Sequence, residues 1–181
     1  MAKGAGKIAL FGMDVDGVLS DGGVYYGDAG LEIKRFHVRD GMGITMLRNA
    51  GVTPFIITAR RSAATARRAG ELRIEEAHQG VHDKPGCLRD IARRHNVSLD
   101  QVSFIGDDLS DLAVLELVGL PMAVADAVDE VKQAAEFVAS RNGGHGAVRE
   151  ACEYVLRLNG YGEAFYALSG YKPVERDESR E

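Results

Sequence analysis

Short apolar runs alternate with longer amphipathic stretches along most of the chain. The apolar runs are too short for ordinary helices, and their nearly continuous apolar character is typical of strands buried on both faces. We expect strands at residues 8–13, 53–58, 102–105 and 122–125, with weaker candidates at residues 74–78 and 137–139.

Helices are predicted between these strands, at residues 43–50, 62–72, 85–95, 109–118, 128–136 and 147–158. Ser62 is a candidate N-cap, Pro85 suits the first turn of a helix, and Ser98 with Gln101 resembles a capping box. This alternation predicts an α/β protein, with a doubly wound, Rossmann-like parallel sheet and helices on both faces.

The interval at residues 22–38 breaks the alternation. Two β-rich runs there flank the turn sequence GDAG at residues 27–30, which predicts a β-hairpin. No insertion is long enough for a separate cap domain, so we expect a single domain at residues 1–160 with the hairpin in its place. Residues 161–181 are expected to form a C-terminal tail that is mobile at its polar end, residues 173–181.

Composition narrows the class of protein. The chain has 181 residues, a hydrophobic share of 45% and a net charge of −5 without a long basic block, which argues against nucleic acid as a partner. Cys87 and Cys152 form no CxxC pattern, so they indicate neither a disulfide framework nor zinc. No apolar run approaches the roughly 20 residues of a membrane span, and none resembles a signal peptide. We therefore expect a cytoplasmic protein with no membrane partner.

Three carboxylates crowd into eight positions of the sequence MDVDGVLSDG, at Asp14, Asp16 and Asp21. Like charges this close raise one another's pKa unless a positive group lies among them. The segment is therefore either a solvated acidic loop or a loop that binds a cation and does chemistry.

The carboxyl ends of parallel strands meet at one edge of a sheet, where ligand sites of such folds gather. At this edge we expect a hydroxyl, an ammonium group and five carboxylates, from Thr58, Lys84, Asp14, Asp16, Asp107, Asp108 and Asp111. Carboxylate oxygens suit Mg²⁺, and the hydroxyl and ammonium groups suit a phosphoryl group. One carboxylate can act as a covalent nucleophile, and a second can act as general acid and base.

Four segments in this order resemble the four motifs of the haloacid dehalogenase-like superfamily: DVDGV at Asp14, the strand-end Thr58, Lys84, and GDDLSD at Asp107. The sequences DVDGVLSDG, FHVRDGMGI, HQGVHDK and GGHGAVRE narrow the resemblance to the capless, tetrameric branch of that superfamily. The similarity runs from about residue 8 to residue 158.

By position in these motifs, the resemblance implies that Asp14 is the nucleophile and a metal ligand. It implies that Asp16 is the general acid and base, with its backbone carbonyl on the metal. Asp107 would be the third protein ligand of a Mg²⁺ ion, and Asp108 and Asp111 would orient the groups around it. All of these residues match the motif positions of the branch.

The resemblance also implies a reaction and an assembly. The reaction is magnesium-dependent hydrolysis of an acidic sugar phosphate through a phosphoaspartyl intermediate, with Thr58 and Lys84 holding the phosphoryl group. The expected substrate is 3-deoxy-D-manno-octulosonate 8-phosphate, and the alternative is a nonulosonate 9-phosphate; Arg60 matches the octulosonate branch better.

In the capless branch of the superfamily the hairpins pack around a homotetramer, and a neighbouring subunit helps to close the site. Ala59 departs from the branch, which usually has Gly there.

For several residues the sequence allows both a structural and a substrate-binding role. His37 is either an ordinary strand-end residue or a sugar contact, Arg39 is a further candidate for substrate binding, and Asp40 is a candidate helix cap. His78 and His82 are four residues apart, but no further zinc ligands are evident nearby.

Arg67 and Arg68 form either a solvated helix face or a sugar contact. The sequence GGHG at residues 143–146 is either a structural turn or a phosphate-binding loop. Tyr25 and Tyr26 either pack in an interface or face the substrate.

Two rival classes of protein share parts of this pattern, a receiver-like signalling module and a regulatory phosphate-binding domain with reduced catalysis. The first places its phospho-accepting Asp on a middle strand, whereas the DxD pattern here follows the first strand. The second would lack part of the catalytic set, which is complete in this sequence.

Overall fold

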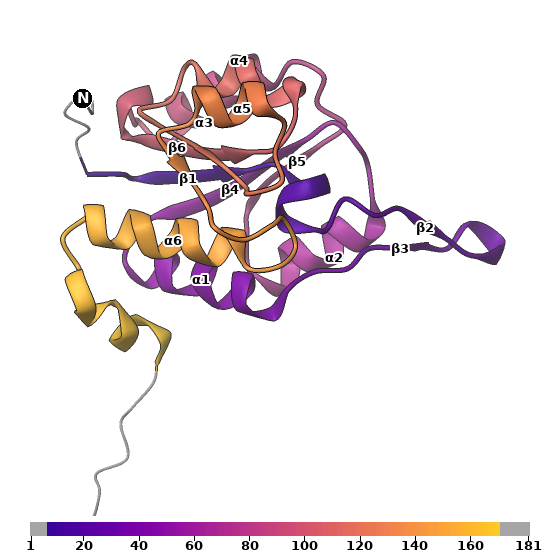
Figure 1. Cartoon of the computed structure of the whole chain (residues 1–181), viewed down its shortest axis with the longest axis horizontal. Coiled ribbons are helices and arrows are strands. Elements are labelled where there is room, and N and C mark those ends of the chain that lie inside the picture. The colour runs from indigo at the N-terminus through magenta and orange to yellow at the C-terminus, as the bar shows by residue number, and fades with distance from the viewer. Residues whose placement is uncertain (1–6, 171–181) are drawn as a thin grey trace, which may run out of the picture.

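The computed structural model of the chain describes residues 7–170. Its centre is a six-stranded parallel sheet in the order β5-β4-β1-β6-β7-β8 (Figure 1). The strands are β1 (Leu10–Met13), β4 (Thr53–Thr58), β5 (Glu76–Gln79), β6 (Val102–Gly106), β7 (Leu120–Ala123) and β8 (Phe137–Val138). β1 is fully buried and lies between β4 and β6, so its carboxyl end is in the middle of the sheet edge.

Helices cover both faces of the sheet (Figure 1). One face carries α1 (Val38–Asn49), α2 (Ala63–Glu71) and α6 (Ala147–Leu158), and the other carries α3 (Lys84–Arg94), α4 (Leu112–Leu115) and α5 (Asp129–Ala134). The predicted doubly wound, Rossmann-like α/β fold is therefore confirmed. None of the helices within residues 7–170 has both the length and the apolar character needed to cross a lipid bilayer.

The start of α1 differs from the sequence prediction. The helix begins at Val38, before the expected residue 43, and it contains Gly41 and Gly43 in its first turns. Glycine is a poor helix former, which is why the sequence favoured a later start. A β-carbon on Gly43 would lie 3.1 Å from Cys152 Cβ and 3.2 Å from Arg149 Cα, so this glycine lets α1 approach α6 closely.

Other helix and strand boundaries also shift by a few residues, and one expected cap does not form. The helix expected at residues 109–118 begins as a tight turn, Leu109–Asp111, and continues as the short α4. β7 lies two residues before its predicted position. The expected capping box at Ser98 is absent, because the Ser98 hydroxyl bonds the Gln101 side chain at 3.1 Å and caps no backbone N–H.

Asp40 does not cap its own helix. It is fully buried in the first turn of α1, and its Oδ1 accepts a hydrogen bond from the backbone N–H of Arg149 at 2.8 Å. Arg149 is in the first turn of α6. The carboxylate therefore joins the starts of two helices, and burial raises its pKa.

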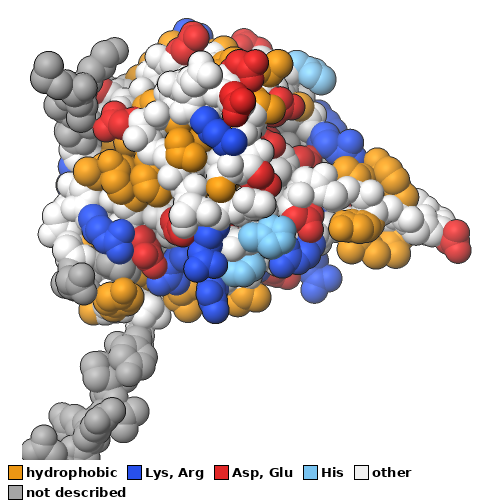
Figure 2. Space-filling model, in the orientation of Figure 1, with side chains coloured by type: hydrophobic (Ala, Val, Ile, Leu, Met, Phe, Trp, Pro, Cys, Tyr) orange, Lys and Arg blue, Asp and Glu red, His pale blue; other side chains and the backbone are white. Residues whose placement is uncertain are grey.

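The predicted hairpin is confirmed. β2 (Tyr25–Tyr26) pairs with β3 (Glu32–Ile33) in antiparallel register, and the connecting turn includes Asp28–Gly30. The hairpin projects from the body beyond the carboxyl end of β1 (Figure 1), and its surface is rich in hydrophobic side chains (Figure 2). Within residues 7–170, the elements form one sheet with its helices and this hairpin, and there is no separate cap domain.

The C-terminal segment Gly162–Ser169 lies against α1. Asn49 Nδ2 donates to the Leu168 carbonyl at 2.7 Å, and the hydroxyl of Tyr161 donates to the Ala50 carbonyl at 3.0 Å. The predicted mobile end at residues 173–181 lies outside the described residues. The division into a domain of 160 residues and a tail stays a prediction.

Candidate active site

The loop that follows β1 places two carboxylates at the sheet edge. The backbone N–H of Asp14 continues the pairing with β6 by donating to the Ile105 carbonyl at 3.1 Å. The chain then turns sharply at Gly17, which has a φ of 92°. A β-carbon there would overlap the carboxylate of Asp107, so only glycine lets this loop lie against the loop after β6.

Asp14, Asp107 and Asp111 form an acidic cluster at this edge. Each offers a carboxylate oxygen, and these oxygens all lie within 4.8 Å of one another. Burial, reinforced by the charge of Asp111, raises the pKa of Asp14 to about 6. Burial, reinforced by the charge of Asp14, raises the pKa of Asp107 to about 8. The cluster therefore concentrates negative charge that needs a compensating cation.

Lys84 supplies part of that compensation. It begins α3, and its buried Nζ lies 3.2 Å from Asp14 Oδ1 and donates to Asp111 Oδ1 at 2.7 Å. Although burial alone lowers the pKa of the ammonium group, the charges of Asp14 and Asp111 outweigh it and raise the pKa. Lys84 is therefore charged and joins two members of the cluster.

Asp111 also shapes the loop after β6. Its Oδ2 accepts the backbone N–H of Asp107 at 3.0 Å, and its Oδ1 is held by Lys84. Asp108 caps the turn, accepting the backbone N–H of Leu109 at 2.8 Å. These contacts are consistent with the prediction that Asp108 and Asp111 support the site. A carboxylate oxygen of Asp111 also lies within 4.8 Å of those of Asp14 and Asp107, which is close enough for the three to share one metal ion.

The donor set fits a hard divalent cation. Asp107 Oδ1 is buried and makes no hydrogen bond to any of the described residues, and Asp14 Oδ1 has only its ion pair with Lys84. Unpaired buried carboxylate oxygens are costly unless a cation meets them, and carboxylates are the ligands that Mg²⁺ prefers. Asp14 and Asp107 would hold such an ion, with Asp111 beside them.

Thr58 ends β4, next to β1 in the sheet, and its side chain is buried. The structure thus brings Asp14, Thr58, Lys84 and Asp107 to one sheet edge, as the sequence predicts. The individual roles of these residues stay predictions.

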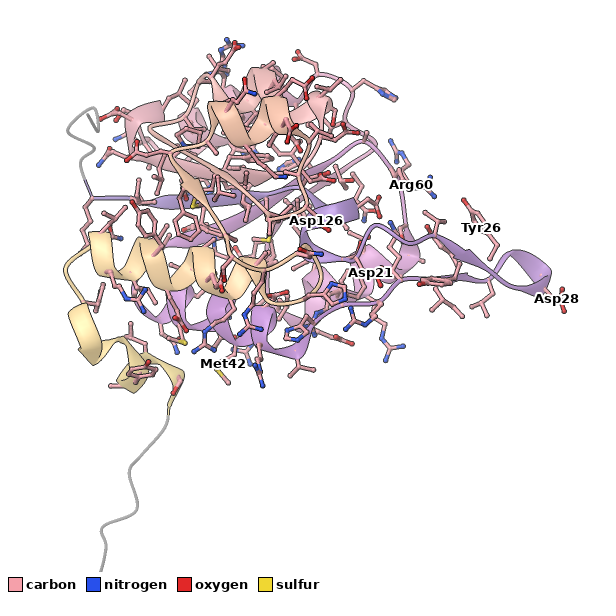
Figure 3. All side chains as sticks on the ribbon, viewed as in Figure 1. Asp21, Tyr26, Asp28, Met42, Arg60 and Asp126 are labelled. Carbon is pink, nitrogen blue, oxygen red and sulfur yellow. The ribbon has the colours of Figure 1, made fainter. Side chains whose placement is uncertain are left out.

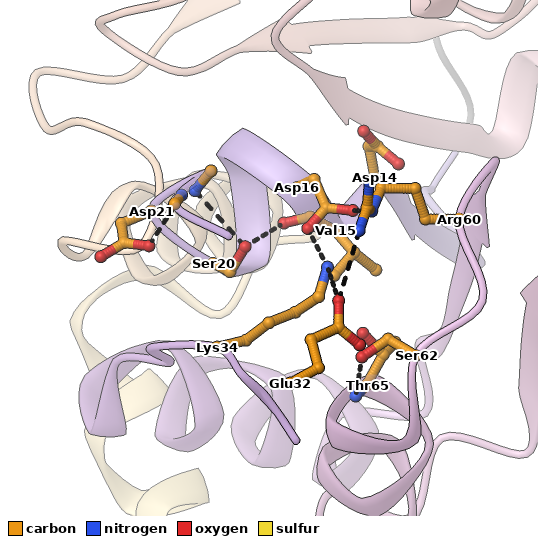
Figure 4. A network of polar contacts seen from close by, with 12 residues as sticks. Asp14, Val15, Asp16, Ser20, Asp21, Glu32, Lys34, Arg60, Ser62 and Thr65 are labelled. Carbon is orange, nitrogen blue, oxygen red and sulfur yellow. Dashed lines mark hydrogen bonds and ion pairs between the residues drawn. The ribbon is translucent and has the colours of Figure 1, made fainter. Parts of the chain in front are cut away.

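The carboxylate of Asp16 points toward Lys34 of the hairpin, and the carboxylate of Asp14 points the other way (Figure 4). Its Oδ1 accepts a hydrogen bond from Lys34, and its Oδ2 lies 3.6 Å from Arg60 Nε. Arg60 also reaches the hairpin, donating to the hydroxyl of Tyr26 at 3.1 Å and to Glu32 Oε1 at 3.4 Å. Figure 3 shows Arg60 and Tyr26 on neighbouring segments beside the sheet edge. The hairpin and the loop that follows β1 therefore meet in one polar network.

Lys34 was missed by the sequence reasoning. A residue that follows the exposed Ile33 in a projecting hairpin gives no signal of burial, yet the Lys34 side chain is 0% exposed. The only hint in the sequence is alternation, since neighbours along a strand point to opposite sides.

The loop at residues 143–146 packs against the loop that follows β1. The backbone N–H of Gly144 donates to the Val18 carbonyl at 2.9 Å, and a β-carbon on Gly143 would overlap the Gly17 carbonyl. Asp126 accepts the backbone N–H of Gly143 at 2.9 Å. These contacts favour the structural interpretation of the GGHG sequence over the phosphate-binding one.

Two predicted substrate residues lie outside the acidic cluster. Arg39 lines a separate cavity of about 420 Å³ between the starts of α1 and α6. His37 precedes α1, with Nδ1 buried and without a hydrogen bond to the described residues. Figure 2 shows Lys, Arg and His side chains gathered near the base of the hairpin. Of the three predicted substrate residues, Arg60 is the one that contacts a catalytic candidate, Asp16.

His78 and Arg67 make structural contacts in the folded chain. His78 bonds Glu76 at 2.7 Å, and Arg94 and His95 bond the same carboxylate, which ties β5 to α3. Hydrogen bonds, chiefly from Arg94, lower the pKa of Glu76 to about 2. Arg67 pairs with Glu71 on the helix surface.

Comparisons with known proteins agree with this geometry. Residues 74–150 match the haloacid dehalogenase-like hydrolase family. The chain is 43% identical over 152 residues to 3-deoxy-D-manno-octulosonate 8-phosphate phosphatase KdsC of Yersinia pestis, covering 84% of this chain and 81% of that one.

Two solved structures have nearly the same fold. A probable YrbI family phosphatase from Pseudomonas syringae has a TM-score of 0.87 and 42% identity, covering 92% of this chain and 95% of that one. The 3-deoxy-D-manno-octulosonate 8-phosphate phosphatase of Moraxella catarrhalis, solved with magnesium, phosphate and KDO, has a TM-score of 0.86 and 39% identity, covering 90% and 94%. The chain therefore belongs to the haloacid dehalogenase-like hydrolases, in the group of capless phosphatases that includes KdsC.

Proposed function

We propose that this protein is a magnesium-dependent phosphatase that hydrolyses 3-deoxy-D-manno-octulosonate 8-phosphate to the free sugar and phosphate. The observation that carries the proposal is the pairing of Asp14 with Lys84 at 3.2 Å, inside a cluster of carboxylates in which the buried Asp107 Oδ1 has no hydrogen-bond partner among the described residues. This arrangement joins a nucleophile, a fixed cation and a cation-binding site at one point of the sheet edge.

The proposed reaction has two in-line displacements at phosphorus. A carboxylate oxygen of Asp14 attacks the phosphorus atom, the bond to the sugar oxygen breaks, and Asp16 gives that oxygen a proton. A water molecule then gives a proton to Asp16 and attacks the same phosphorus, which releases phosphate and restores Asp14.

The other residues at this edge of the sheet balance the charge of the phosphoryl group and orient the substrate. Lys84 balances the charge of Asp14 and of the phosphoryl group, and the Thr58 hydroxyl donates a hydrogen bond to a phosphoryl oxygen. Magnesium, when bound by Asp14 and Asp107 with the Asp16 carbonyl, supplies positive charge that offsets the crowded oxygens. Arg60, His37 and Arg39 are proposed as contacts of the sugar acid.

The choice of substrate rests on the relatives. The KdsC enzyme of Yersinia pestis and the structure from Moraxella catarrhalis both carry the name of the octulosonate 8-phosphate phosphatase. Identity of 43% over most of both chains supports the same substrate here. A cytoplasmic location is part of the proposal.

We also propose a homotetramer built through the hairpins. Tyr25, Tyr26, Leu31 and Ile33 are all more than half exposed on a hairpin that projects from the body. Exposed apolar side chains concentrated in this way mark an interaction surface. Sedimentation at several protein concentrations tests the assembly, and a monomer throughout would contradict it.

The experiment for the proposed function measures phosphate release by the purified protein with magnesium. The panel contains 3-deoxy-D-manno-octulosonate 8-phosphate, nonulosonate 9-phosphates, hexose phosphates and an aryl phosphate. We expect the highest kcat/KM for the octulosonate ester. We expect Asp14→Asn to abolish turnover of every ester without changing the thermal unfolding midpoint by more than a few °C, because the replacement keeps the size of the side chain.

Each outcome is informative. A preference for a nonulosonate ester would keep the mechanism and change the substrate. Substantial activity of the Asp14→Asn variant would overturn the nucleophile assignment. No turnover of any ester by the wild-type protein would overturn the proposed function.

A further inference from the structure

Lys34 is the buried cation of the hairpin. It follows β3, and its side chain is 0% exposed. The ammonium group donates to Asp16 Oδ1 and lies 3.9 Å from Glu32 Oε1. Because a lysine is almost never fully buried unless it is paired, the contact with Asp16 explains its position.

The two oxygens of Asp16 have different surroundings. Oδ1 accepts the hydrogen bond from Lys34. Oδ2 is buried and has no hydrogen-bond partner among the described residues, since Arg60 Nε is 3.6 Å away. Oδ2 thus has an ion pair with Arg60 but accepts no hydrogen bond from the described residues, so it keeps the capacity to accept or give a proton during the reaction.

We propose that Lys34 is a positioning residue that fixes the rotation of the Asp16 carboxylate and leaves Oδ2 as the atom that exchanges the proton. This inference rests on the proposed function. In the first step the proton moves from Oδ2 to the sugar oxygen as the oxygen–phosphorus bond breaks. In the second step a proton of the attacking water moves to Oδ2. Lys34 holds Oδ1 by a hydrogen bond and so fixes the carboxylate with Oδ2 as the oxygen that faces the reacting groups.

The position of Lys34 in the chain gives this contact a second consequence. The residue belongs to the hairpin, whereas Asp16 belongs to the loop after β1. The orientation of the acid and base thus depends on how the hairpin lies against the body. Arg60 joins the same network through Glu32 and Tyr26, so three segments set the geometry around one carboxylate.

The test is a double-mutant cycle with Lys34→Met, Asp16→Asn and the double variant. We expect Lys34→Met to lower kcat by about 10- to 100-fold with KM changed by less than about threefold, because the substrate still binds while the Asp16 carboxylate loses the hydrogen bond that fixes Oδ1. Lys34→Arg is expected to recover a substantial part of the loss, since a guanidinium group can also donate to Oδ1. In the Asp16→Asn background, Lys34→Met should cause no further loss.

Arg35→Met is the matched control. Arg35 is the next residue along the same segment, but it bonds the Gly144 carbonyl at 3.0 Å and lies 3.8 Å from Asp21. We expect its replacement to lower kcat much less than Lys34→Met does, because Arg35 makes no contact with Asp16, so a larger loss in Lys34→Met cannot come from disturbing the segment in general.

Three results would overturn the inference. One is a Lys34→Met variant with wild-type kcat, and another is an equal loss of kcat in the wild-type and Asp16→Asn backgrounds. The third is additivity of the shifts in the denaturation midpoint around the cycle, which would show that the two side chains do not interact. That measurement needs no substrate. If the wild-type protein hydrolyses the aryl phosphate but not the octulosonate ester, only the proposed substrate is overturned. The double-mutant cycle is then measured with the aryl phosphate as substrate.

Discussion

At the scale of single residues, Gly17 meets two constraints at once. Its φ of 92° lies in a region that residues with a β-carbon rarely adopt, and the carboxylate of Asp107 occupies the space where a β-carbon would stand. The first constraint concerns the backbone, and the second concerns the distance between the two loops that carry the acidic cluster. A suitable control separates them.

Gly17→Ala is expected to lower kcat by about 100-fold or more, because the methyl group pushes Asp107 out of the cluster. Gly51→Ala is the control, since Gly51 has a φ of 80° with open space around its Cα. That variant should lose about 1–2 kcal/mol of stability from backbone strain and keep its kcat. Steady-state kinetics and thermal unfolding of both variants make the comparison. Near-wild-type kcat in Gly17→Ala would contradict this account of the site.

At the scale of elements, the contact between α1 and α6 holds the start of the catalytic region in place. The helices approach closely at Gly43, and the buried Asp40 joins their first turns. The residues just before α1 return from the hairpin, and the loop just before α6 covers the loop that contains Asp14. Movement of one helix against the other would therefore disturb both sides of the site.

Gly43→Ala tests how tight this contact is. Alanine normally favours a helix over glycine by about 0.5–1 kcal/mol, and Gly70→Ala in α2, where no atom lies within 4 Å, should show that gain. At Gly43 the methyl group would press on the Arg149 backbone, so we expect a net loss of about 1–2 kcal/mol, or roughly 2–8 °C in the unfolding midpoint. If both variants gain stability equally, α1 and α6 are not in close contact.

The same elements show how far the sequence predicts the structure. Buried strands such as β4 are predictable. Its mainly apolar run of six residues is too short for an ordinary helix and suits a strand covered on both faces. The start of α1 is not predictable, because the value of Gly41 and Gly43 lies in contacts with α2 and α6 that no local pattern reveals.

Part of the candidate active site was also predictable from the sequence, and part was not. Asp14 and Asp107 follow strands whose ends meet in any parallel sheet, so their convergence was predictable. The contact between Lys34 and Asp16 was not, because it depends on how the hairpin folds back on the loop.

At the scale of the whole molecule, the sheet edge brings buried carboxyl groups close together. Asp14 and Asp107 have pKa values of about 6 and about 8, whereas each titrates near 3.8 when unperturbed. The folded protein without metal therefore keeps protons that the unfolded chain has already lost. The stability of the metal-free protein must fall as the pH rises from about 4 to about 8.

Thermal unfolding between about pH 5 and pH 8 tests this, with a chelator or with magnesium. We expect the midpoint to fall with rising pH in the chelator, and magnesium to raise it more at the upper end of the range, by several °C. Asp107→Asn should flatten the pH dependence and weaken the response to magnesium. Glu76 does not interfere, because its lowered pKa of about 2 affects stability only in more acidic solution. If magnesium does not change the thermal unfolding midpoint at pH 8, the result would contradict the proposed metal site.

The contact between the Gly143–Gly144 turn and the loop after β1 also bears on the order of events during synthesis. Asp14 leaves the ribosome early, but β6, which pairs with β1, and Gly144, which bonds Val18, are made much later. Contacts between distant parts of a chain form slowly, because a long loop must close first. A nascent chain that ends before Gly143 lacks this support for the catalytic loop, so the edge of the sheet that binds metal is completed only near the end of translation.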